Sequence, residues 1–171
     1  YIERISQSGG FLGIAFLVTA ALLYFSQKAK KRAKTIETMS YTDAAIIGVT
    51  QGIAVMPGIS RSGSTTSAGL FLGMEKEDSL RFAFLMSIPV ILGSAVMGVK
   101  DIVSEPEMIA WGPIIAGMIA AGVSGYFAVR FMLNFFKKRS LNVFAVYTAI
   151  LGILILADQL FFQKFFLVFL V

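Results

Sequence analysis

The chain of 171 residues contains no cysteine and no histidine. The lack of cysteine excludes a disulfide framework, and the two absences together exclude a zinc site built on Cys or His. No histidine of this chain can act as a general base. Proline occurs only four times, and ten acidic residues stand against fifteen lysines and arginines.

Apolar residues dominate what is present. They make up 57% of the sequence, and the mean hydropathy of +0.79 is too high for an ordinary soluble domain of this length. Several apolar runs approach the ~20 residues that cross a bilayer. The basic residues gather in short segments between these runs, and no aromatic residue interleaves the charges of residues 28–34. This distribution favours a membrane protein and argues against nucleic acid as a partner.

The pattern of apolar runs predicts an all-α integral membrane protein, a multi-span helical bundle. Residues 1–27 carry an N-terminal transmembrane span, and residues 28–42 form a basic loop that we place in the cytoplasm. Residues 43–74 predict a re-entrant helix hairpin, because two apolar segments of half length flank a Pro-Gly break. Residues 75–171 provide three further transmembrane spans and a tail.

The charges of the loops agree with this topology. If residues 28–34 lie in the cytoplasm and the hairpin returns to the same side, the basic residues 137–139 also fall inside and the acidic segment 101–107 falls outside. A single full span in place of the hairpin would put these later loops on the wrong sides.

The helices of the hairpin have sequence signals at their ends. Ser40 or Thr42 can cap a first helix that runs to about Met56, and its roughly 14 residues reach about 21 Å, short of a ~30 Å hydrocarbon core. After the break we expect a second helix from Ser64 to about Met74.

The break itself concentrates polar groups. Residues 57–65 (PGISRSGST) combine the guanidinium of Arg61 with four hydroxyls, and Gly58 and Gly63 permit unusual backbone turns. If the helix begins near Ser64, the amides of residues 62–65 lack intrahelical partners and favour phosphate, as does the bidentate fork of Arg61. We therefore predict Arg61 as the catalytic residue, buried in a site whose substrate-binding residues are Ser60, Ser62, Gly63, Ser64, Thr65 and Gln51, the last two turns upstream.

A simpler interpretation of the same residues is helix capping by Ser62 or Ser64, with Arg61 snorkelling to the interface. Arg81, Arg130 and Asp158 lie near the ends of spans, where we expect them to face the interface.

Residues 51–65 (QGIAVMPGISRSGST) resemble the second signature of the undecaprenyl-diphosphate phosphatases of the bacitracin-resistance type. The resemblance continues through residues 68–74 (AGLFLGM) and 81–89 (RFAFLMSIP). It implies a membrane enzyme of the plasma membrane that hydrolyses a polyprenyl diphosphate and recycles the lipid carrier of cell-envelope synthesis. It also implies one half of an inverted-repeat architecture. In that family Arg61 matches the catalytic arginine, and Ser60, Ser62 and Thr65 match hydroxyls that contact phosphate.

The resemblance has one departure. The family's first signature, with paired glutamates, a serine-rich loop and a histidine, has no counterpart here. We interpret the chain, which begins at Tyr1, as a fragment or processed product of about two-thirds of a family member, catalytically incomplete alone. A divalent metal, which the resemblance implies, would be held largely by the missing half and the diphosphate, with no metal ligand predicted in this chain.

Two further questions stay open at the level of sequence. A broken-helix transporter or channel could bind an anion at the same loop. A homodimer is compatible with the sequence, which does not fix the oligomeric state.

Overall fold

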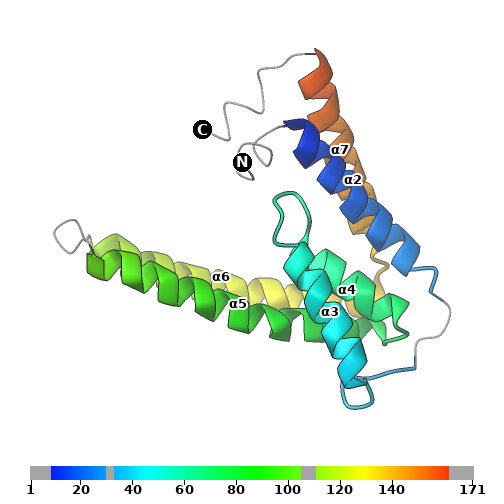
Figure 1. The fold of residues 1–171 in the computed structure, drawn as a ribbon, viewed down its shortest axis with the longest axis horizontal. Coiled ribbons are helices and arrows are strands. Elements are labelled where there is room, and N and C mark those ends of the chain that lie inside the picture. The colour runs from blue at the N-terminus through cyan, green and yellow to red at the C-terminus, as the bar shows by residue number, and fades with distance from the viewer. Residues whose placement is uncertain (1–8, 30–32, 105–110, 162–171) are drawn as a thin grey trace.

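The computed structural model describes residues 9–29, 33–104 and 111–161, and over these residues it contains six α-helices and no β-strand. Figure 1 shows α2 beside α7 in one arm, α5 beside α6 in a second arm, and the short α3 and α4 where the arms meet. The predicted all-α class is confirmed. The expectations for residues 1–8, 105–107 and 162–171 lie outside the described residues. The helices are α2 (Gly9–Ser26), α3 (Tyr41–Ile53), α4 (Arg61–Phe71), α5 (Lys76–Ser104), α6 (Trp111–Lys138) and α7 (Asn142–Phe161).

Four of these helices are long and apolar enough to cross a membrane, namely α2, α5, α6 and α7. The other two, α3 with 13 residues and α4 with 11, are too short to do so. The helices follow the order that the sequence analysis expected, one long helix, a short pair and three long helices, and their crossing of a membrane stays a prediction.

The ends of the short helices differ from the sequence prediction. α3 begins after Ser40, whose hydroxyl accepts a hydrogen bond from the Asp43 amide while the Asp43 carboxylate accepts one from the Ser40 amide. It ends at Ile53 and not at Met56, because tight turns at Val55 and Met56 replace helical bonds ahead of Pro57. α4 begins at Arg61, three residues before the predicted Ser64.

The two ends of the helix pair meet at one base. The Glu75 amide donates to the Lys34 carbonyl oxygen at 2.8 Å, and the Ile36 amide donates to the Asp78 carboxylate at 3.0 Å. The Lys34 ammonium lies 2.9 Å from Asp43, and with the Ser40 bonds it lowers the pKa of that carboxyl to about 2. The chain therefore forms a closed hairpin, as a re-entrant segment requires, and its side of the membrane stays a prediction.

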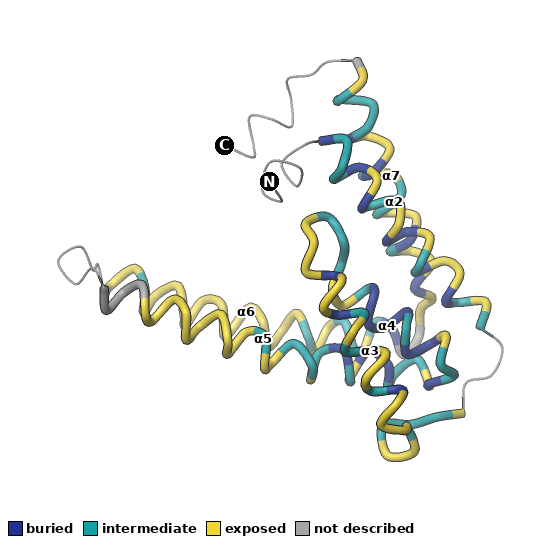
Figure 2. Tube along the Cα trace, in the orientation of Figure 1, coloured by how far each residue is buried: buried dark blue, intermediate teal, exposed yellow. Residues whose placement is uncertain are grey.

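The hydrophobic core lies where the arms join the hairpin. Its buried side chains come from α2, α4, α5, α6, the residue before α7 and α7 itself. Phe84, Met132, Leu133, Phe135 and Phe144 pack around them. Figure 2 shows buried segments at this junction and along the α2–α7 arm, whereas the outer part of the α5–α6 arm is exposed. Since the exposed arm is largely apolar, lipid is a suitable environment for it. The core residues are Leu23, Leu70, Leu80, Phe136, Leu141 and Ala145.

The turn at Gly58 provides a test of the hairpin. Gly58 has φ +85°, and an added Cβ would lie 2.8 Å from the Ala15 Cβ. We expect Gly58→Ala to lower the free energy of unfolding by about 1–3 kcal/mol. Gly52→Ala is the matched control, because a Cβ there meets nothing within 4 Å. Thermal unfolding in detergent measures both, and equal stability of the two variants would contradict the strained turn.

The membrane side of the hairpin can be tested by labelling, because the chain has no native cysteine. Cysteines at Tyr41 and Glu75, both exposed, should react with an impermeant maleimide from the same side of sealed vesicles. A cysteine at Trp111, at the opposite end of α6, should react from the other side. Tyr41 and Glu75 reacting from opposite sides would show that the segment crosses the membrane.

Candidate functional site at the hairpin tip

The tip of the hairpin is organised by Ser60. Its hydroxyl accepts a hydrogen bond from the Gly63 amide at 3.1 Å and so caps α4. Its own amide donates to the hydroxyl oxygen of Thr19 in α2 at 3.2 Å. Neither Ser62 nor Ser64, the two residues of the capping interpretation, is the cap.

Gly63 is not a turn residue, contrary to the sequence expectation. It lies in the first turn of α4, and the positive φ angles of the described residues belong to Gly58 and Gly73. A Cβ at Gly63 would lie 3.0 Å from the Ser60 Oγ. The missing side chain therefore leaves room for the capping hydroxyl.

The early start of α4 changes which amides can bind a ligand. The Gly63 amide is taken by the Ser60 hydroxyl, and the Ser64 amide donates to the Ser60 carbonyl oxygen at 2.8 Å. The amides of Arg61 and Ser62 remain at the positive end of the helix dipole. The donor set is thus narrower than the four amides expected from the sequence.

Arg61, Ser62 and Gln51 line one cavity of about 270 Å³. Ala83, Phe84 and Ser87 of α5 form its remaining lining. The Gln51 side-chain nitrogen donates to the Met86 carbonyl oxygen at 3.0 Å, which ties α3 to α5 beside the cavity. The structure therefore brings together three of the predicted site residues, whose roles in binding stay predictions.

The guanidinium of Arg61 is available to a ligand. Arg61 and Ser62 are exposed, so the expectation that this part of the chain buries Arg61 is wrong. Arg61 is the first residue of α4 and follows the N-cap Ser60 directly. No carboxylate among the described residues pairs with its guanidinium. An unpaired guanidinium next to a helix N-terminus suits a phosphate group, because it can donate two parallel hydrogen bonds to the phosphate oxygens.

Other predicted residues lie away from this cavity. Ser64 and Thr65 are buried at 3% and 1% exposure, and the Thr65 hydroxyl donates to the Arg61 carbonyl oxygen at 2.7 Å. Ser60 and Gly63 line a smaller cavity of about 60 Å³ on the side of the hydrophobic core, which Ser62 also borders. The buried hydroxyl side chains of α4 are small, which lets α2, α3 and α5 pack closely around it.

Thr19 is a residue of the site that the sequence analysis missed. It is 1% exposed and lies 41 positions before the amide that it binds. The signal was an isolated Thr in the apolar run of residues 9–23. Ser87 likewise interrupts an apolar run and lines the Arg61 cavity.

The described residues do not fit a divalent-metal site by themselves. They contain no group of three or more Asp, Glu, His or Cys residues that could hold a metal ion. The lining of the Arg61 cavity includes no carboxylate. Direct carboxylate ligation of a metal at this cavity is therefore not available from its lining.

Comparison with known proteins gives a consistent result. The family described as bacitracin resistance protein BacA matches residues 1–154. A protein named undecaprenyl-diphosphatase from Carboxydothermus hydrogenoformans is 43% identical over 162 residues, which cover 93% of this chain and 62% of that protein. One of the same name from Parabacteroides distasonis is 46% identical over 163 residues, covering 93% of this chain and 60% of the relative.

A third relative differs in length. The protein named undecaprenyl-diphosphatase from Methanothermobacter thermautotrophicus is 43% identical over 163 residues, which cover 94% of this chain and 90% of that protein. The chain thus spans about three fifths of the bacterial relatives above and about nine tenths of this one.

The hydrogen bond from Ser60 to Thr19 can be tested by substitution. We expect Thr19→Val to lower the free energy of unfolding by about 1–2 kcal/mol, because the half-buried Ser60 amide would lose its partner. Thr19→Ser keeps the hydroxyl and should lower the free energy of unfolding clearly less than Thr19→Val does. Thr148→Val is the control, since that hydroxyl bonds carbonyls of its own helix. Thermal unfolding and hydrogen exchange at the Ser60 amide are the measurements, and unchanged exchange in Thr19→Val would contradict the contact.

Proposed function

Because this chain belongs to the bacitracin resistance protein BacA family, we propose that it carries the phosphate-binding half of a polyprenyl-diphosphate phosphatase. Its substrate is a diphosphate of undecaprenyl type. Water supplies an oxygen to the terminal phosphorus, the anhydride P–O bond breaks, and the products are the lipid monophosphate and inorganic phosphate. This reaction recycles the lipid carrier of cell-envelope and peptidoglycan synthesis and is the basis of the resistance to bacitracin that the family name describes.

The observation that carries the proposal is the free guanidinium of Arg61 beside Ser62 and the first amides of α4. Phosphoryl transfer needs mainly positioning and stabilisation of negative charge on the phosphoryl oxygens. Arg61 can donate hydrogen bonds to two of these oxygens. The amides of Arg61 and Ser62 lie at the positive end of the α4 dipole, which favours negative charge beside the guanidinium. Gln51 lines the same cavity and offers a polar side chain to the second phosphate.

We further propose a multi-pass location in the plasma membrane, with the lipid diphosphate as partner and no role for nucleic acid. A homodimer is our preferred assembly.

A divalent metal is also part of the proposal, held by the diphosphate oxygens and by glutamates of the family's first signature. The described residues of this chain do not provide its ligands. No role of Arg61 or Ser62 proposed here depends on the metal.

The rival function is a transporter or channel with a broken helix that binds an anion at the same loop. Membership of the family favours the phosphatase. Release of inorganic phosphate from a soluble short-chain isoprenyl diphosphate in detergent separates the two, when this chain is combined with the part of the Carboxydothermus relative that it does not match. A transporter would leave the anhydride intact.

Arg61→Lys tests the role of the guanidinium in the intact enzyme. The variant keeps the charge and loses the bidentate fork, so we expect phosphate release to fall by about 10³-fold or more, the scale of an arginine at a phosphoryl transition state. Arg139→Lys, outside the cavity, is the matched control and should keep its activity. Retention of more than about a tenth of the turnover, a loss below ~1.4 kcal/mol, would reduce Arg61 to a general electrostatic role.

The purified 171-residue chain should not turn over substrate by itself. The Arg61 cavity has no carboxylate in its lining, the chain has no histidine, and a serine needs a base to become a good nucleophile. Co-expression with the part of the Carboxydothermus relative that this chain does not match should restore phosphate release. Full activity of the lone chain would show that its own residues supply the base.

A further inference from the structure

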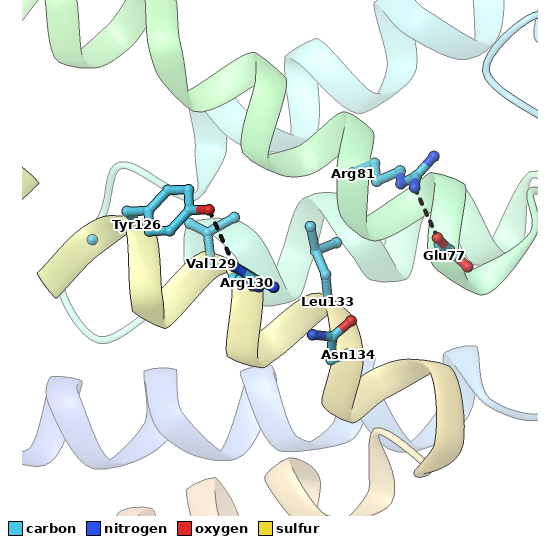
Figure 3. A pocket seen from close by; sticks show the side chains of 8 residues that line it. Glu77, Arg81, Tyr126, Val129, Arg130, Leu133 and Asn134 are labelled. Carbon is cyan, nitrogen blue, oxygen red and sulfur yellow. Dashed lines mark hydrogen bonds and ion pairs between the residues drawn. The ribbon is translucent and has the colours of Figure 1, made fainter. Parts of the chain in front are cut away.

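A second cavity, of about 560 Å³, lies between α5 and α6, away from the hairpin tip. Figure 3 shows its polar side chains on two helices, Glu77 and Arg81 on α5 and Tyr126, Arg130 and Asn134 on α6. Within each helix these residues are four positions apart, which places them on one face. The cavity shares no lining residue with the Arg61 cavity.

The side chains of this cavity carry an excess positive charge. Arg81 pairs with Glu77 at 3.0 Å, whereas Arg130 bonds the neutral Tyr126 hydroxyl at 3.3 Å and has no acidic partner among the described residues. Two guanidinium groups against one carboxylate leave one net positive charge. Both arginines belong to helices that can cross a membrane, where an uncompensated charge is costly.

The cavity lies near the end at which α6 finishes in the basic residues 137–139 and α5 begins with Lys76, Glu77 and Asp78. The Lys76 ammonium donates to the Arg139 carbonyl oxygen at 2.7 Å, which holds the start of α5 against the end of α6. Arg81 is five residues from Lys76 and Arg130 eight from Lys138, or about 8 and 12 Å along the helix axes. This depth corresponds to the headgroup boundary of the leaflet that we predict to be cytoplasmic.

We propose that this cavity binds the headgroup of an anionic phospholipid from that leaflet. A phosphodiester carries one negative charge, which matches the one uncompensated cation of the cavity. Arg130 can grip its oxygens, and Tyr126 and Asn134 offer further hydrogen bonds. The Arg81 side chain is 51% exposed, so the cavity is open to lipid. Val129 and Leu133 line it beside the arginines and give an acyl chain an apolar path, which free phosphate would not use.

Native mass spectrometry of the purified chain tests the site, with dioleoylphosphatidylglycerol, dioleoylphosphatidylcholine and inorganic phosphate as probes. We expect the chain to retain phosphatidylglycerol in preference to phosphatidylcholine and to inorganic phosphate. Arg130→Gln should weaken this retention by about fivefold, the order of one basic residue near a membrane surface. Arg139→Gln, a basic residue at the same end but outside the cavity, is the matched control and should retain the lipid as wild type does.

Two further measurements decide how a loss of lipid binding is interpreted. Arg130→Lys keeps the charge and should retain more phosphatidylglycerol than Arg130→Gln, and circular dichroism should show the same helix content in all variants. Equal weakening by Arg130→Gln and Arg139→Gln would reduce the effect to general basic charge and overturn the site. Binding of inorganic phosphate as strong as that of the lipid would overturn the lipid headgroup as the ligand. No preference for phosphatidylglycerol in the wild-type chain would overturn the proposal altogether.

Discussion

The hydrogen bonds around Ser60 determine where the polar groups of the hairpin tip lie. The Ser60 hydroxyl caps α4 through the Gly63 amide, and the Ser60 amide binds Thr19 of α2. The cap makes Arg61 the first residue of α4, where its side chain is exposed and lines the cavity with Gln51 and Ser62. The bond to Thr19 holds the N-terminal end of α4 against α2 of the α2–α7 arm. The positions of Arg61 and Ser62 in their cavity depend on both bonds.

The base of the hairpin complements the tip. Lys34 and Asp43 form an ion pair, and the backbone of residues 33–36 bonds the segment that follows α4. Polar contacts therefore gather at the base, whereas the helices between base and tip pack through small hydroxyl side chains and through Gln51. This division suits a segment that enters a bilayer from one side, because the Lys34–Asp43 ion pair stays at the wet end and Arg61 is the one charged residue between Asp43 and Glu75.

Much of this fold could be predicted from the sequence, because its signals are local. Apolar runs and basic loops predicted the four long helices, and Pro57-Gly58 marked the break between two short ones. The start of α4 could not be predicted in the same way, since Ser60, Ser62 and Ser64 are all good caps. Ser60 is the cap in the structure, and its amide donates a hydrogen bond to Thr19, which lies 41 residues earlier in the sequence. A local sequence signal does not contain this contact. The exposure of Arg61 likewise depends on how the hairpin meets α5, which composition does not encode.

The central claim is that Arg61 holds the terminal phosphate of the lipid diphosphate. Solid-state NMR can measure dipolar coupling between the phosphorus of a non-hydrolysable methylene diphosphonate analogue and ¹⁵N-labelled guanidinium groups in the membrane-embedded enzyme. The account predicts strong coupling to Arg61, because guanidinium nitrogens that hydrogen-bond phosphate oxygens lie close to the phosphorus, and loss of that signal in Arg61→Lys. A coupling that persists unchanged in Arg61→Lys, carried by another arginine, would contradict it.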